Sequence, residues 1–215
     1  MKNIKFIYFD IGGIILEKNK LPSFYISKEL GIEESKYKNV EIDIFNKRKF
    51  PNNSNIDDEI EYYRNSLKLI CNTLNLEYSD KLLQYEIKKD YYLKEYSLEL
   101  LDFLKNKYKL GVLSNGKPSR RIYEFKNFGL DKYFEVIILS KETPYNKPDR
   151  RIFQIAVNKV GLPLDNILFI DNDIENIKGA EKFGIENLIY FNENGNIKSS
   201  YIEVRDLKEI KNILK

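Results

Sequence analysis

The chain has 215 residues, which is enough for one domain of ordinary size or for one domain with a modest insertion. Apolar residues make up 42% of it and charged residues 32%, so the sequence can form both a buried core and a soluble surface. Its 36 basic and 33 acidic residues leave a net charge of only +3, which argues against a nucleic-acid or anionic-membrane partner.

Two scarce residue types narrow the possible chemistry. The sequence contains no histidine, which excludes Ser-His-Asp and Cys-His catalysis and any zinc site built on histidine. Its one cysteine, Cys71, cannot form an internal disulfide, so we expect a reducing, cytoplasmic setting. No run approaches the roughly 18 apolar residues that cross a bilayer, so we expect no membrane partner. Any reaction must therefore use carboxylates, lysines, hydroxyls, amides or backbone groups.

The first predicted element is a strand over residues 4–9, a nearly continuous apolar run that is typical of a central parallel strand covered on both faces. Residues 17–92 then show weak strand signals and several helical faces, of which the clearest runs from Ile60 to Leu74. Asn55, just ahead of three acidic residues, suits the start of that helix. This stretch predicts a small helical insertion after the first strand.

Beyond the insertion, strand-like runs alternate with helical faces. The strand-like runs are residues 109–113, 136–139, 167–170 and 188–191. Such alternation is typical of an α/β fold with a parallel sheet. We therefore predict a Rossmann-like parallel-sheet core, formed by residues 1–16 and 93–215, with a small α-helical cap domain at residues 17–92.

Polar residues follow four of the predicted strands. Because the carboxyl ends of parallel strands meet at one edge of a sheet, where ligands bind, we expect these residues to share one pocket. In chain order, the candidates are Asp10, Gly12, Ser114, Asn115, Lys147, Asp171 and Asn172.

Two of these candidates are carboxylates that suit phosphate and metal chemistry. Asp10 closes a strand and can act as a nucleophile that forms an acyl phosphate. Asp10, Asp171 and the carbonyl of Gly12 could together hold Mg²⁺, which prefers oxygen ligands and often shares them with a substrate phosphate.

The other candidates could bind an anion. Ser114, with the amides near Asn115, could form a small nest for phosphate oxygens. Lys147 would bring positive charge to the transferring group and to the nucleophile. By contrast, we interpret Arg120 as a helix-surface charge and the aromatic residues of the insertion, including Tyr91, as core rather than as a substrate cage.

The motifs, taken in order, resemble those of the haloacid dehalogenase superfamily, and within it the subgroup whose helical cap follows the first strand. The matching segments are FDIGGIIL at 9–16, LSNG at 113–116, KPD at 147–149 and FIDND at 169–173. The resemblance implies a nucleophilic Asp10, phosphate contacts from Ser114 and Lys147, a magnesium cofactor, and phosphatase activity on a small phosphorylated metabolite.

Two positions depart from the pattern of the phosphatases in that family. Most of them have a second Asp, the general acid and base, where this chain has Gly12, although some sugar-phosphate phosphatases also read Asp-x-Gly. Many have a metal-binding Asp where this chain has Asn172. On the sequence alone, Gly12→Asp is expected to restore acid catalysis.

These departures leave two alternatives open. The chain could be a metal-independent 2-haloacid dehalogenase in which Asp10 attacks carbon, although such enzymes have an aromatic residue at the Gly12 position. It could also be a catalytically weak or non-catalytic member that binds a metabolite or a partner. The sequence is equally compatible with a monomer and a homodimer.

Overall fold

Six parallel strands form the central sheet, in the order β5-β4-β1-β6-β7-β8. This computed structural model describes residues 3–215, so residues 1 and 2 of the predicted core lie outside it. The strands are β1 Phe6–Phe9, β4 Lys109–Ser114, β5 Val136–Leu139, β6 Ile167–Asp171, β7 Asn187–Phe191 and β8 Ile202–Val204. The predicted α/β fold with a Rossmann-like parallel sheet is confirmed.

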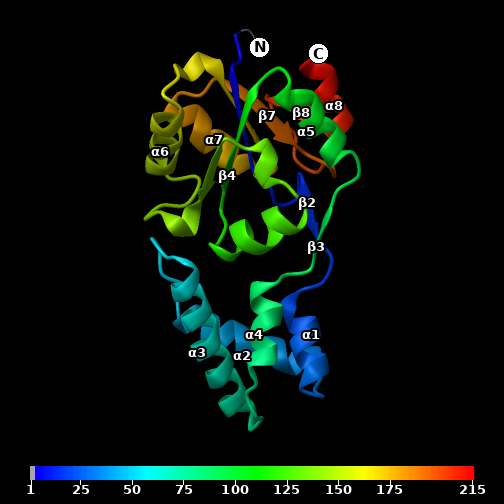
Figure 1. Cartoon of the computed structure of the whole chain (residues 1–215), viewed down its shortest axis with the longest axis vertical. Coiled ribbons are helices and arrows are strands. Elements are labelled where there is room, and N and C mark those ends of the chain that lie inside the picture. The colour runs from blue at the N-terminus through cyan, green and yellow to red at the C-terminus, as the bar shows by residue number, and fades with distance from the viewer. Residues whose placement is uncertain (1–2) are drawn as a thin grey trace.

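Helices cover both faces of this sheet, in the upper part of the molecule (Figure 1). They are α5 Ser97–Lys105, α6 Arg150–Val160, α7 Ile174–Phe183 and α8 Leu207–Ile213. Alternate side chains of β1 point to opposite faces, so Ile7 and Phe9 join the core of α5 and α8, while Phe6 and Tyr8 join that of α6 and α7. The whole strand is buried, which explains its continuous apolar run.

A second lobe, below the sheet in Figure 1, contains four helices: α1 Pro22–Glu29, α2 Glu34–Lys47, α3 Ile56–Leu74 and α4 Asp80–Ile87. These helices have a hydrophobic core of their own, which includes Tyr37, Tyr63 and Leu67. As predicted, α3 begins after Asn55. The side-chain oxygen of Asn55 accepts hydrogen bonds from the backbone amides of Asp57 and Asp58. None of the helices in residues 3–215 has the length and apolar character needed to span a lipid bilayer.

Two short strands carry the chain between the lobes. β2 Leu16–Lys18 and β3 Tyr91–Leu93 pair antiparallel, one leaving the sheet lobe and the other returning to it. Our predicted domain boundaries, after residues 16 and 92, fall inside this ribbon, and we keep them as a proposal. The hydroxyl of Ser97, at the start of α5, donates to the carbonyl of Ile15 and so ties the return strand to the core.

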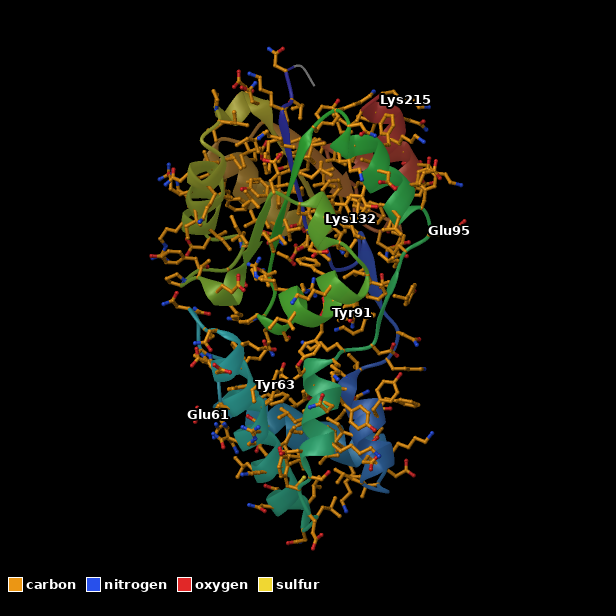
Figure 2. All side chains as sticks on the ribbon, viewed as in Figure 1. Glu61, Tyr63, Tyr91, Glu95, Lys132 and Lys215 are labelled. Carbon is orange, nitrogen blue, oxygen red and sulfur yellow. The ribbon has the colours of Figure 1, made fainter. Side chains whose placement is uncertain are left out.

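Polar contacts also join the helical lobe directly to the sheet lobe. Glu59 of α3 is fully buried, and its carboxylate accepts hydrogen bonds from the backbone amide and the hydroxyl of Ser119, each 2.8 Å long. Lys117 donates to the hydroxyl of Tyr63, which Figure 2 shows in the part of the helical lobe that faces the sheet lobe. These contacts link the two lobes, and leaving the buried amide of Ser119 without its acceptor would carry an energetic cost.

Candidate functional site

Three charged side chains meet beyond the carboxyl ends of the strands. The Nζ of Lys147 lies 2.9 Å from Oδ1 of Asp10 and 2.6 Å from Oδ2 of Asp171. The side chain of Lys147 is fully buried and that of Asp171 is 1% exposed, whereas that of Asp10 keeps 12% of its surface accessible. Within this charge cluster, Asp10 is therefore the group that a substrate can reach. The structure thus brings together three residues that are far apart in the sequence.

With two carboxylates and one ammonium, the cluster has a formal net charge of −1. Burial opposes the ammonium form of Lys147, but the two neighbouring carboxylates outweigh it and raise the pKa of this lysine. Burial raises the pKa of Asp171 to about 6, and the attraction of Lys147 opposes this rise. The carboxylate is also held by the backbone amide of Asp173 at 2.8 Å and by Nδ2 of Asn176, 3.2 Å from both its oxygens.

Asn115 positions Lys147 through its backbone. The amide nitrogen of the Asn115 side chain donates to the Lys147 carbonyl at 3.0 Å, and its oxygen accepts from the Lys147 amide at 2.9 Å. The backbone amide of Gly116 donates to the carbonyl of Ser114. The predicted anion nest therefore has fewer free hydrogen-bond donors than expected, because the Gly116 amide and the Asn115 side-chain amide already donate within the protein.

Arg120 is a site residue that the sequence analysis did not identify. It begins a π-helical segment, η1 Arg120–Phe125, and is only 9% exposed, so its interpretation as a surface charge is wrong. Its Nε lies 2.9 Å from Glu124, its Nη1 donates to the hydroxyl of Ser114 at 3.5 Å, and its Nη2 donates to the hydroxyl of Tyr91 at 3.2 Å. The guanidinium also lies beside Gly12, since a Cβ built there would be 3.8 Å from Nη1.

A cavity of about 630 Å³ opens next to this cluster. Loops at the carboxyl ends of the strands form one wall, with Gly12, Asn115, Arg120 and Asn172. The connecting ribbon and its flanks supply more of the lining, including Tyr91, which Figure 2 shows at the junction of the lobes. Tyr91 packs against the sheet core, as interpreted from the sequence, and it also lines the cavity. A volume of this size suits a small metabolite.

The oxygen atoms beside the cavity are of the type that binds magnesium, but they are fewer than the six ligands of an octahedral Mg²⁺ ion. The Oδ2 of Asp10, the carbonyl of Gly12 and the side-chain oxygen of the exposed Asn172 are hard ligands of the kind that Mg²⁺ prefers. Asp171 is held differently, because protein donors occupy both of its oxygens. Across residues 3–215, no three acidic, histidine or cysteine side chains group as a metal site, so water and a substrate phosphate would complete the coordination.

The curated relatives include both phosphatases and dehalogenases. The glyceraldehyde 3-phosphate phosphatase of Methanothermobacter thermautotrophicus is 26% identical over 54% of this chain and 55% of its own length. The (S)-2-haloacid dehalogenase 4A of Burkholderia cepacia is 30% identical over 46% of this chain and 42% of its own length. The chain therefore spans about half the length of these relatives.

The solved structures show the same fold at lower identity. The crystal structure of 2-haloacid dehalogenase from Pseudomonas syringae pv. Tomato DC3000 has a TM-score of 0.76 with this chain, covers 98% of both chains and is 15% identical. Residues 7–189, which are most of the sequence, match the family of haloacid dehalogenase-like hydrolases. With six parallel strands placing Asp10, Lys147 and Asp171 at one edge of the sheet, this chain belongs to the haloacid dehalogenase-like hydrolase family.

Proposed function

We propose that this hydrolase is a Mg²⁺-dependent phosphomonoesterase that acts on a small phosphorylated metabolite through an aspartyl-phosphate at Asp10. The observation that carries the proposal is the state of the Asp10 carboxylate. Its Oδ1 is held by Lys147, while its Oδ2 has no hydrogen-bond partner within the described residues and the side chain keeps some exposure. An oriented, partly accessible carboxylate with one uncommitted oxygen suits nucleophilic attack.

In the proposed reaction, Oδ2 of Asp10 attacks phosphorus and the bond from phosphorus to the alcohol oxygen breaks. Water then attacks the phosphorus of the aspartyl-phosphate, which releases inorganic phosphate and restores the carboxylate. Lys147 keeps the attacking group in place and reduces the repulsion between it and the phosphate. Arg120 can present its remaining N–H groups to the phosphate oxygens from the cavity wall.

The proton that the departing alcohol needs has no side-chain source at Gly12. General acid catalysis typically contributes about 10²- to 10⁴-fold, so we expect slow turnover of substrates with poor leaving groups. Bound Mg²⁺ would supply positive charge that stabilises the transferring phosphoryl group. Asp10, the Gly12 carbonyl and Asn172 are the residues that we propose as its ligands, with Asp171 behind them.

Phosphate release from sugar phosphates, nucleotides and p-nitrophenyl phosphate, measured with Mg²⁺, tests the proposal. We expect release by the wild-type protein and none by Asp10→Asn, which is nearly isosteric and keeps the side-chain volume. Release that is equal in the two proteins, or absent from both, would contradict the proposal. Binding of a phosphate ester without release would support the non-catalytic alternative.

A haloacid dehalogenase is the second candidate, favoured by the neutral Gly12 and Asn172, by a guanidinium beside Asp10 that could hold a substrate carboxylate, and by relatives of that name. A single turnover in ¹⁸O-labelled water separates the two mechanisms. In the phosphatase, water attacks phosphorus and the label enters inorganic phosphate. In the dehalogenase, water attacks the carbonyl carbon of an Asp10 ester and the label enters the Asp10 carboxylate, which mass spectrometry of the peptide detects.

A further inference from the structure

Three lysines line the cavity on the side that adjoins the helical lobe. Lys18 comes from β2, Lys89 from the segment between α4 and β3, and Lys117 from the loop after β4. In the part of the chain that the structure describes, no carboxylate oxygen lies within ion-pair distance of Lys18, Lys89 or Lys117. Lys18 and Lys89 therefore line the cavity without a carboxylate partner among residues 3–215, whereas the Nζ of Lys117 donates to the hydroxyl of Tyr63.

The acidic residues of the cavity wall are already paired. Glu17 lies 3.8 Å from Lys94, and Glu124 lies 2.9 Å from Arg120. On the side of the helical lobe, Glu59 accepts two hydrogen bonds from Ser119. Glu86 lies behind the lysines, where burial raises its pKa and so weakens it as a counter-charge. The excess of positive charge at this end of the cavity is thus built into the fold.

The lysines are also close enough to repel one another. Burial and the charge of Lys89 lower the pKa of Lys117 to about 8, although Glu86 opposes the shift. Burial, Lys89 and Arg120 likewise lower the pKa of Lys18. Mutual repulsion among side chains that line one cavity is relieved when an anion binds between them.

We propose that the substrate carries a second anionic group, a carboxylate or a second phosphate, which Lys18, Lys89 and Lys117 bind on the side of the cavity that adjoins the helical lobe. The inference rests on the proposed phosphatase function, since the first anionic group is the phosphate at Asp10. It narrows the substrate class to metabolites with negative charge at both ends.

Two pairs of substrates test the proposal. Glycerol 3-phosphate and 3-phosphoglycerate differ by a carboxylate, and fructose 6-phosphate and fructose 1,6-bisphosphate differ by a phosphate. We expect kcat/KM to be at least about tenfold higher for the member with the second anionic group, a difference that one or two partly screened charge contacts can supply. The pair that shows the larger ratio identifies the second group. Equal values within both pairs would overturn the inference and leave the phosphatase proposal intact.

Substitutions then assign the effect to the lysines. Lys89→Met and Lys18→Met should each lower kcat/KM for the preferred substrate by about tenfold, and change that for its partner with one anionic group by less than about threefold. Lys159→Met, which removes an exposed lysine on α6 far from the cavity, is the matched control and should change neither. Equal losses on both substrates would show a structural role and overturn the assignment.

A binding experiment keeps the inference testable if no phosphate ester is hydrolysed. Calorimetric titration of the Asp10→Asn protein with 3-phosphoglycerate and with glycerol 3-phosphate compares the two ligands without turnover. Tighter binding of 3-phosphoglycerate that Lys89→Met abolishes would support the lysine site even where the phosphatase proposal has failed. Equal affinities would overturn it.

Discussion

Gly12→Asp should not restore the acid catalysis that the sequence alone leads one to expect. A Cβ fits at this position, since its nearest atoms would be 3.8 to 3.9 Å away. Those atoms are, however, the guanidinium of Arg120 and Oδ2 of Asp10. At a charge separation of about 4 Å and an effective dielectric constant of about 20, each charge would act on a new carboxylate with about 4 kcal/mol, in opposite directions.

Hydrogen bonding decides between these two nearly equal effects. Arg120 can donate N–H groups to an ionised carboxylate, whereas Asp10 has none to donate. A hydrogen bond to a charged group is worth about 1.5 to 3 kcal/mol, which lowers the pKa of the introduced carboxyl by about one to two units. The group would thus be ionised at neutral pH, with no proton to give to a departing alcohol.

We therefore expect Gly12→Asp to raise kcat on glycerol 3-phosphate by less than about tenfold, well short of the roughly 10²- to 10⁴-fold that general acid catalysis supplies. In an Arg120→Gln/Glu124→Gln background, Gly12→Asp should raise kcat on glycerol 3-phosphate at least about a hundredfold relative to that double variant. Hydrolysis of p-nitrophenyl phosphate is the internal control, because its phenolate leaves without a proton. A hundredfold gain from Gly12→Asp alone would refute the argument.

Three further predictions concern the metal, the helical lobe and the contact between the lobes. Asn172→Asp should tighten Mg²⁺ binding about tenfold by adding a carboxylate ligand, measured by calorimetry, whereas Asn158→Asp on the exposed side of α6 should have no effect. Burial raises the pKa of Glu41 to about 7, so its contribution to stability is present below about pH 4.3 and is lost as the pH rises to 7. The free energy of unfolding in urea should then be roughly 1 to 2 kcal/mol higher for Glu41→Gln than for wild type at pH 8, and equal to it at pH 4. Glu95→Gln, at an exposed position, should leave the free energy of unfolding unchanged at both pH values. A gain in stability from Glu41→Gln at pH 4 would contradict this prediction. Glu59→Ala should lower the free energy of unfolding by about 1 to 3 kcal/mol, because the buried amide of Ser119 loses its acceptor, and Glu59→Gln should lower it by less. If both variants had the stability of wild type, the contact would not hold the lobes together.

The strands of the core were predictable because the sheet is covered on both faces. Burial of whole strands, as in β1 and β6, leaves continuous apolar runs in the sequence. The three short strands were not predicted, and the reason is also physical. β8 is interrupted by a glutamate and has one buried residue, Val204, while β3 is an apolar run of only three residues with none buried.

The candidate site was predictable to the extent that topology decides it. Asp10, Lys147 and Asp171 meet because the carboxyl ends of parallel strands share one edge, and that edge can be inferred from the order of the motifs. Arg120 was missed because its pairing with Glu124 four residues later is the same pattern that exposed helix pairs show. Only tertiary packing buries this pair, and neither local sequence nor spacing carries that information. The support that Asn176 gives to Asp171 left no sequence signal for the same reason.

The distribution of charge gives the proposed metal and the proposed lysine site separate tasks. The charge cluster has a formal net charge of −1 and Glu124 offsets part of the positive charge of Arg120, so without the metal the inner end of the cavity attracts a phosphate dianion only weakly. The lysines at the outer end attract anions regardless of any metal. Chelation of Mg²⁺ should consequently abolish phosphate release while 3-phosphoglycerate still binds, with its affinity reduced but still dependent on Lys89. Calorimetric titration in EDTA, with wild type and Lys89→Met side by side, measures this. If chelation removed binding altogether, the lysines would not act as an independent anion site, and the cavity would bind its ligand from the inner end alone.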